Sequence, residues 1–282
     1  MAVLLPPQQV YGGGNDVSAS SRINSALPSR QMSNGARNFA PSISDQRAAG
    51  AAQSLGGLSL SKRVARRAQA RYLGGMTIIP LAPGATLMPG YLARDAQLKL
   101  LADIDAVLRA APLYTPRMPK SGKPMSVRMS NCGPLGWVTD EAGYRYQAMH
   151  PDAGTPWPPI PEALLAAWRD LSGYAAAPEA CLINHYGADA RMGLHQDRDE
   201  EDFAAPVVSL SLGDTCVFRL GGTRRSDPTR SLRLASGDAL VLAGEARLAF
   251  HGVDRILPGT STLLPQGGRI NLTLRRVTRP AA

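Results

Sequence analysis

The chain has 282 residues, 44% of them hydrophobic, which is enough to form the core of one large domain or of two small ones. Its formal net charge is +9, but residues 1–75 hold nine Lys or Arg against two Asp (net +7), so the rest carries only +2 and the total charge is weak support for nucleic-acid binding by a folded domain. Three cysteines without CxxC spacing argue against a disulfide framework or a zinc-thiolate site and fit a reducing cytoplasm.

Residues 1–75 have the composition of a disordered basic tail. Ser, Ala, Gly, Asn and Gln dominate the first 60 residues, which offer too little apolar surface to offset chain entropy. The segment SKRVARRAQARY (61–72) can form a short basic helix; a solvated linker, a nucleic-acid arm, a transit peptide and a mistaken start codon all remain open. We place one folded domain at 76–282.

The stretch 72–93 is uncharged and long enough to span a bilayer. Its three prolines and four glycines argue against a transmembrane helix, so we expect no membrane partner.

Two amphipathic helices are predicted next, at 94–111 and 161–176. In the first, the apolar residues that share one helical face are Leu98, Leu101, Ile104, Val107 and Leu108. In the second they are Leu164, Leu165, Trp168 and Leu171, and Pro161 suits the first turn.

After these helices the periodicity changes from 3.6 to two. The predicted strands are 181–186, 191–195, 206–212, 215–220, 230–234, 238–243, 248–251 and 269–276. Short strands separated by Gly, Asp and Pro favour a sandwich or jelly roll, with the two helices covering one sheet. The predicted class is therefore mainly β with flanking helices.

The first candidate site is the motif LHQDRDEED (194–202). On a strand, residues i and i+2 share a face, so His195 and Asp197 would point the same way. With His251 from another strand end, they would form two imidazoles and one carboxylate, the ligand set of non-haem Fe(II) oxygenases. Zinc accepts similar ligands, and an HxD motif alone is more often a surface turn or a histidine satisfied by structural hydrogen bonds.

The second candidate site is RINLTLR (269–275), which alternates strictly. Ile270, Leu272 and Leu274 would face a core, and the opposite face would then carry two arginines, Arg269 and Arg275, with Asn271 and Thr273. Paired arginines suit a ligand with two carboxylates. An amphipathic edge strand with a solvated face is the alternative, and the HxD motif together with a distant histidine favours the dicarboxylate.

Together these motifs resemble the AlkB family of Fe(II)/2-oxoglutarate-dependent dioxygenases, which are nucleic-acid demethylases. The resemblance extends from about residue 81 to about residue 276 and rests on five segments: SVRMSNCGPLGW, CLINHYG, LHQDRDE, FRLGGTRRSDP and RINLTLR. It implies a double-stranded β-helix, or jelly roll, with a nucleotide-recognition lid.

The resemblance also implies residue roles around the iron. His195, Asp197 and His251 would hold Fe(II). Arg269 would pair with the distal carboxylate of 2-oxoglutarate, and Arg275 would lie near its metal-bound end. The expected hydrogen-bond partners of the co-substrate are Asn184, Tyr186 and Asn271. His185 should point to the opposite face of its strand and so lie outside the site.

For the substrate, the resemblance implies that Trp137 and His195 enclose a flipped base. Tyr144 would lie near the nucleotide phosphate, Asp199 near the base edge, and Arg225 at the border of the pocket. Asp199 would share the metal-facing side if its strand continued past Asp197. The remaining acidic residues, Glu200, Glu201 and Asp202, are expected to form a solvated turn.

The implied activity is DNA repair by oxidative demethylation of 1-methyladenine and 3-methylcytosine in single-stranded DNA, with RNA as a further candidate substrate. The reaction uses Fe(II), 2-oxoglutarate and O₂ and releases formaldehyde, succinate and CO₂. A cytoplasmic monomer is expected. Residues 113–147 would decide between DNA and the alternatives of RNA, tRNA or protein. A non-catalytic nucleic-acid-binding module would be expected to have lost a ligand or Arg269, and all are present.

Overall fold

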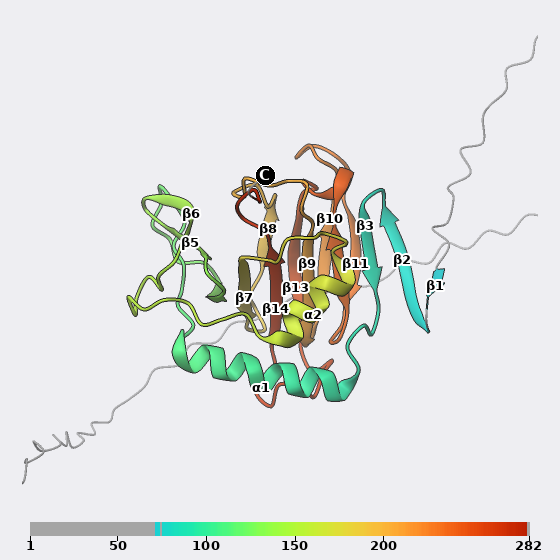
Figure 1. Ribbon diagram of the computed structural model, residues 1–282, viewed down its shortest axis with the longest axis horizontal. Coiled ribbons are helices and arrows are strands. Elements are labelled where there is room, and N and C mark those ends of the chain that lie inside the picture. Colours follow the sequence, from blue (N-terminus) through green and yellow to red (C-terminus); the bar gives the residue numbers. More distant parts are fainter. Residues whose placement is uncertain (1–70, 74, 281–282) are drawn as a thin grey trace, which may run out of the picture. The chain divides into compact units, whose positions relative to one another are not determined.

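The computed structural model describes residues 71–73 and 75–280 (Figure 1). Apart from residues 71–73 and 75, the predicted tail lies outside the described residues. The first half of the described chain contains β1 (Arg71–Leu73), β2 (Met76–Ala82), β3 (Ala85–Met88), α1 (Arg94–Ala110), β4 (Val127–Cys132), β5 (Gly136–Asp140), β6 (Gly143–Gln147) and α2 (Glu162–Leu171). The second half contains β7 (Ala180–Tyr186), β8 (Met192–His195), β9 (Val207–Gly213), β10 (Thr215–Leu220), β11 (Arg230–Leu234), β12 (Ala239–Leu242), the 3₁₀ turn η1 (Gly244–Ala246), β13 (His251–Leu257) and β14 (Arg269–Arg275).

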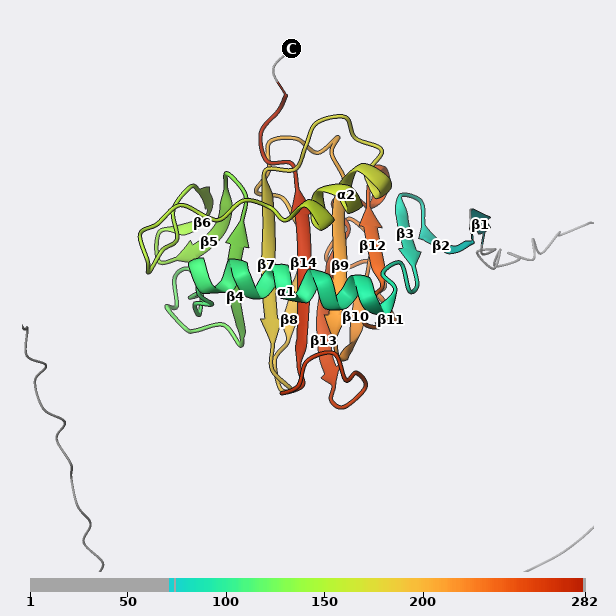
Figure 2. The ribbon, with the colours of Figure 1, turned by 60° about the horizontal axis from the view of Figure 1, so that its bottom comes forward.

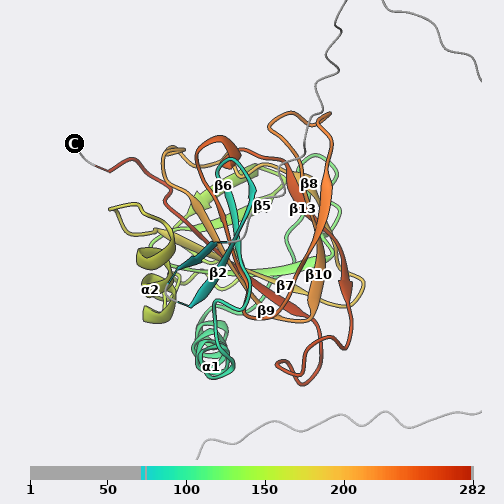
Figure 3. The same ribbon diagram turned by 90° about the vertical axis from the view of Figure 1, so that its right-hand side faces the viewer.

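The described strands form two facing sheets and a separate hairpin. The larger sheet has eight antiparallel strands in the order β1-β2-β3-β12-β9-β14-β7-β4, and the smaller has four in the order β11-β10-β13-β8. Strands β5 and β6 pair only with each other. Figure 3, which looks along the layers, shows the smaller sheet on one side of the larger sheet and both helices on the other. This is the predicted jelly roll with flanking helices.

Both helices pack on one face of the larger sheet, and α1 crosses its strands (Figure 2). The core between helices and sheet includes Leu100 and Ile104 of α1, Trp168 of α2 and Leu272 of β14. Full burial of each leucine or isoleucine side chain in this core contributes roughly 1.5–3 kcal/mol. The large apolar contact explains why a helix without a side-chain N-cap bond, as α1 is, remains stable.

Both helix predictions need correction. The buried face of α1 includes Gln97 and Leu100, whereas Leu98 is 47% exposed, so the predicted apolar stripe is rotated by about one residue. Gln97 is buried because its side chain hydrogen-bonds Leu92 O and Ser236 Oγ, which anchors the start of the helix. Helix α2 ends at Leu171 rather than at residue 176, because Gly173 takes a positive φ of 60° just past the C-cap.

The strand predictions hold for seven of the eight segments within one or two residues. The eighth, 248–251, is wrong: the turn η1 precedes it, and His251 begins β13 instead of ending a strand. Five strands between 76 and 147 were not predicted, among them the β5–β6 hairpin. The stretch 72–93 supplies β2 and β3, and no helix among the described residues is long and apolar enough to cross a membrane.

Candidate active site

A cavity of about 960 Å³ lies between the two sheets and extends to the β5–β6 hairpin. The larger sheet contributes polar residues of β7, β9 and β14 to it, and the smaller sheet contributes residues of β8, β10 and β13. Each sequence-predicted site residue lines this one cavity: Trp137, Tyr144, Asn184, Tyr186, His195, Asp197, Asp199, Arg225, His251, Arg269, Asn271 and Arg275. His185 does not line it, as strand alternation predicted.

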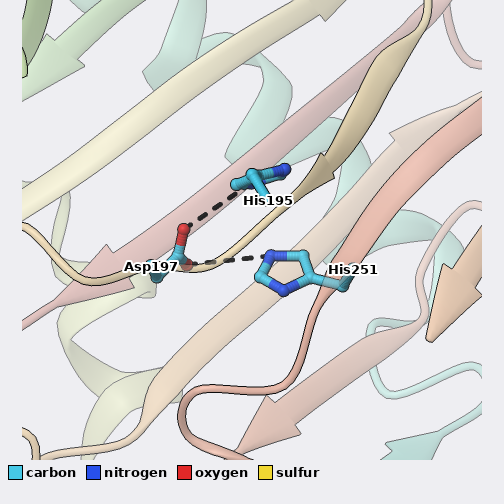
Figure 4. Close-up of side chains that lie close together, drawn as sticks. All are labelled: His195, Asp197 and His251. Carbon is cyan, nitrogen blue, oxygen red and sulfur yellow. Dashed lines mark ion pairs between the residues drawn. The ribbon is translucent and has the colours of Figure 1, made fainter. Parts of the chain in front are cut away.

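Two histidines and an aspartate meet in the cavity (Figure 4). His195 ends β8 and His251 begins β13, and the two residues are directly paired across these strands with ring centroids 4.5 Å apart. Asp197 Oδ1 lies 3.7 Å from His195 Nε2, and its Oδ2 lies 3.9 Å from His251 Nε2. One potential ligand atom from each of the three residues lies within 4.8 Å of the others, which is close enough for the three to share a metal ion.

A hydrogen bond to a backbone carbonyl fixes the orientation of each imidazole. His195 Nδ1 lies 2.9 Å from Gly193 O, and His251 Nδ1 lies 2.9 Å from Ala249 O. A carbonyl only accepts, so each Nδ1 carries the proton, and the Nε2 lone pairs point toward Asp197 as metal ligation requires. Burial lowers the pKa of His251 to about 4, which keeps this ring neutral and able to ligate a metal.

Asp197 is held by an arginine from the opposite sheet. Arg275 donates to Asp197 Oδ2 from Nε at 3.2 Å and from Nη2 at 2.9 Å. Burial alone would raise the pKa of this carboxyl, but the charge of Arg275, with the two histidines, holds the pKa below its ordinary value. The ionised carboxylate leaves Oδ1 free of Arg275, facing His195.

The strand interpretation of the HxD motif is wrong in one respect. Strand β8 ends at His195, so Asp197 and Asp199 lie in the following loop and strand alternation does not place them. The loop itself turns both carboxylates toward the cavity.

The polar face of β14 lines the cavity, as its alternation predicted. Ile270 and Leu272 pack toward the helices, while Arg269 and Arg275 face inward. Arg269 is 1% exposed and donates to Asp214 O, Leu234 O and Ser211 Oγ, with no acidic partner in the described ranges 71–73 and 75–280. A buried guanidinium bonded only to neutral groups favours an anionic ligand.

Unpaired polar atoms mark the same region. Of four buried side-chain atoms without a hydrogen-bond partner in the described part of the chain, three belong to cavity residues: Asn184 Oδ1, Arg269 Nε and Arg275 Nη1. Such atoms are costly unless a ligand or water satisfies them. Two arginine donors on one strand, six residues apart, fit a ligand with a carboxylate at each end, as 2-oxoglutarate has. Two imidazoles and a carboxylate fit Fe(II) with positions left open.

Asn271 and Tyr186 have different surroundings. Asn271 Nδ2 already donates to Ser209 Oγ and Leu210 O, and its Oδ1 accepts from Thr273 Oγ1. Burial raises the pKa of Tyr186, so its hydroxyl stays protonated and can donate into the cavity.

The aromatic residues of the β5–β6 hairpin border the cavity mouth. Trp137 stacks on Tyr144 with centroids 5.6 Å apart and an interplanar angle of 19°. Its backbone is clamped by Asn131, whose Oδ1 accepts from Trp137 N and whose Nδ2 donates to Trp137 O, both at 3.0 Å. The indole Nε1 donates to Asp199 Oδ2 at 2.7 Å. Arg225 donates to Leu194 O and lies over the Phe250 ring.

The expected solvated turn at 200–202 is wrong for two of its three residues. Glu200 is 5% exposed and Asp202 6% exposed, whereas Glu201 faces solvent. Glu200 pairs with Arg247, which is buried, and accepts a hydrogen bond from Tyr146 at 2.5 Å. The sequence did not predict the contacts among Glu200, Arg247 and Tyr146, because no local signal connects an acidic run to an arginine 47 positions away.

Comparison with known proteins agrees with this geometry. Residues 84–275 match the family model described as 2OG-Fe(II) oxygenase superfamily. The alpha-ketoglutarate-dependent dioxygenase AlkB homolog of Caulobacter vibrioides is 56% identical over 215 residues, which cover 76% of this chain and 97% of that protein. AlkB of Salmonella typhimurium is 43% identical over 201 residues, covering 70% and 92%.

The chain belongs to the AlkB family of Fe(II)/2-oxoglutarate-dependent dioxygenases. The solved structure of OsALKBH1 shares its fold, with a TM-score of 0.60 and 31% identity over 71% of this chain and 99% of that one. As an AlkB-family dioxygenase the protein uses Fe(II), 2-oxoglutarate and O₂, and the donor set in the cavity fits these groups.

Proposed function

We propose that this AlkB-family protein is an oxidative demethylase of N-methylated bases in nucleic acids, with 1-methyladenine and 3-methylcytosine in single-stranded DNA as its substrates. The observation that carries the proposal is a single cavity that holds a His-Asp-His cluster inside and a Trp-carboxylate pair at the mouth. The reaction consumes O₂ and 2-oxoglutarate and yields succinate, CO₂, formaldehyde and the unmodified base. Such chemistry places the protein in DNA repair.

The metal and co-substrate are assigned as follows. His195, Asp197 and His251 would hold Fe(II), which together with 2-oxoglutarate and O₂ would supply the oxidising power for hydroxylation of the N-methyl group. Arg269 binds the distal carboxylate, since it is buried and bonded only to neutral groups. Arg275 lies at the metal-bound end, because it already contacts Asp197. The remaining hydrogen bonds to 2-oxoglutarate come from Asn184, Tyr186 and Asn271.

The base is bound at the mouth of the cavity. Trp137 offers an aromatic face for stacking, and the side chain of His195, 41% exposed, faces the space from the metal side. Tyr144 lies near the nucleotide phosphate, and Arg225 borders the pocket. Asp199 uses Oδ2 to hold Trp137, which leaves Oδ1 to accept from the exocyclic amine of a cationic methylated base.

Single-stranded nucleic acid is the favoured substrate because the methyl groups in question lie on the Watson–Crick edge. A base in a duplex would have to leave the stack and its pair before reaching the metal, at a cost of a few kcal/mol. A cytoplasmic monomer is the form in which we expect the protein to act.

The test is product release by protein reconstituted anaerobically with Fe(II) and 2-oxoglutarate and then given O₂. With a 1-methyladenine DNA oligonucleotide we expect formaldehyde and succinate in equal amounts, with less formaldehyde from the matching RNA. Formaldehyde from a methylated peptide alone would reassign the substrate to protein, and nucleic-acid binding without any product would indicate a non-catalytic binding module.

A further inference from the structure

Two adjacent carboxylates in the loop after β8 hold two paired residues of the β5–β6 hairpin. Trp137 and Tyr146 lie directly opposite each other on these strands. Trp137 Nε1 donates to Asp199 Oδ2 at 2.7 Å, and the Tyr146 hydroxyl donates to Glu200 Oε1 at 2.5 Å. The hairpin is therefore bound at one cross-strand pair to the loop that also carries the metal-facing Asp197.

The second of these bonds is buried, which makes it the stronger constraint. Burial raises the pKa of Tyr146 well above its usual value, so the hydroxyl keeps its proton and donates a hydrogen bond to the carboxylate. The side chain of Glu200 is 2% exposed. Burying an ionised carboxylate is costly unless the carboxylate is paired. A hydrogen bond to an ionised carboxylate is also stronger than a hydrogen bond between two neutral groups.

Arg247 supplies one partner of Glu200 and fixes the whole loop. It donates from Nη1 to Asp197 O at 2.7 Å and from Nε to Ala205 O at 2.8 Å, while its Nη2 lies 3.1 Å from Glu200 Oε2. One buried guanidinium thus contacts the start, the middle and the end of the segment 197–205. Arg247 itself stands four residues before His251.

The second arginine that pairs with Glu200 is Arg275. Its Nε lies 3.4 Å from Glu200 Oε1 and 3.2 Å from Asp197 Oδ2, so the same arginine contacts both carboxylates. The continuous path runs from Tyr146 on the hairpin through Glu200 and Arg275 to Asp197. Without Glu200, two buried guanidiniums would compete for the Asp197 carboxylate and its backbone oxygen.

We propose that Glu200 is a positioning residue that orients Asp197 for the metal and makes metal affinity and nucleotide binding under the Trp137 hairpin mutually dependent. The metal half concerns this chain alone, and the nucleotide half rests on the proposed function. Thermodynamic linkage requires the effect to be reciprocal. An oligonucleotide that stabilises the bound hairpin increases the affinity of the protein for the metal, and the metal increases its affinity for the oligonucleotide by the same factor.

The chain contains a matched control pair. The Tyr174 hydroxyl donates to Asp202 Oδ2 at 2.5 Å, and Asp202 is buried only two residues beyond Glu200. Neither residue forms a hydrogen bond or ion pair with Arg247 or Arg275 within the part of the chain that the structure describes. The variants Glu200→Gln and Tyr146→Phe are therefore compared with Asp202→Asn and Tyr174→Phe.

The first measurement is Co(II) affinity by calorimetry and visible absorption in the presence of 2-oxoglutarate, without nucleic acid. We expect Glu200→Gln to bind Co(II) about 10–100-fold more weakly than wild type with an altered spectrum, as loss of support behind a metal ligand does. The Co(II) affinities of Asp202→Asn and Tyr146→Phe should remain within about twofold of the wild-type affinity, because both variants keep the Glu200 carboxylate. Wild-type affinity and spectrum in folded Glu200→Gln would overturn the positioning role.

The second measurement repeats the Co(II) titration with a saturating 1-methyladenine trinucleotide. In wild type and Tyr174→Phe the trinucleotide should tighten Co(II) by about fivefold or more, the lower end of ordinary coupling, and in Tyr146→Phe the factor should fall toward one. The coupling would be overturned if the trinucleotide increased Co(II) affinity by the same factor in Tyr146→Phe and Tyr174→Phe, or did not increase it in wild type. Tyr146→Phe decides this even if Glu200→Gln does not fold. Absence of trinucleotide binding to wild type would instead contradict the proposed function, and the first measurement would still test Glu200.

Discussion

Arg275 reaches from β14 of the larger sheet to Asp197 in the loop after β8 and bonds one oxygen of that carboxylate with two of its nitrogens, at 2.9 and 3.2 Å. Both side chains are 6% exposed. The contact ties the two sheets together at the point where the proposed metal ligand must be oriented. An ion pair this deeply buried is sensitive to the loss of one partner, because the other charge then remains unpaired away from water.

Arg275→Met should therefore destabilise the metal-free protein. We expect the free energy of unfolding in urea to fall by about 3–5 kcal/mol, the usual result of breaking a buried pair. The control is Arg255→Met, which removes the arginine of an exposed pair with Asp254 and should change stability by about 0–1 kcal/mol. Equal effects of the two substitutions would show that the Asp197 contact contributes little to folding.

His251→Ala should abolish formaldehyde and succinate release and leave the fold largely intact. The ring faces the cavity, and the core between the larger sheet and the helices lies on the other face of that sheet. Activity and circular dichroism of the variant check the two halves of this expectation, together with Co(II) binding. Near wild-type formaldehyde release would remove His251 from the proposed ligand set.

A pH dependence of stability should follow from His185, which lies outside the cavity. Burial, and then the charge of Arg128, lowers the pKa of His185 below its ordinary value. Below about pH 6.5 the unfolded chain takes up a proton that the folded protein resists, so the contribution of His185 to stability is lost as pH falls. Urea unfolding from pH 7.5 to 5 should show a smaller decrease for His185→Gln than for wild type, and identical slopes would contradict the assignment.

Local periodicity predicted those parts of the molecule that depend on a single strand or helix. The alternation of 269–275 placed both arginines on the cavity face, and the strand run from 181 onward predicted the jelly roll. His195 and Asp197 do meet, but through a loop, so the prediction was right in outcome and wrong in its strand geometry.

The errors share a physical cause, which is contact between segments distant in sequence. Nothing in DEED shows that Arg247 will fold onto Glu200 and bury it, and nothing near Leu98 shows that the neighbouring Gln97 will be drawn inward by Ser236. The strands of the β5–β6 hairpin were missed because each has only five residues and Trp137 and Val138 of β5 break the alternation of apolar and polar residues. Gly136 is required there by packing, since a Cβ would lie 2.4 Å from the Trp157 ring.

The last prediction concerns how the mouth of the cavity distinguishes bases. 3-Methylcytosine is cationic, whereas 3-methylthymine is neutral. The face of Trp137 attracts a cation by about 0.5–2 kcal/mol, depending on desolvation, and Asp199 adds a negative charge at the base edge.

Asp199→Ala should therefore lose more single-strand demethylation activity on 3-methylcytosine than on 3-methylthymine. The structure adds a second consequence, because Asp199 also holds the indole of Trp137, so part of the loss will be common to both lesions. Trp137→Ala removes the stacking surface for either base together with the attraction of the ring for a cation. The ratio of kcat/KM for the two lesions is therefore compared with that of the wild type: a lower ratio in Asp199→Ala supports recognition of the cation, and an equal proportional loss on both lesions would limit Asp199 to positioning Trp137.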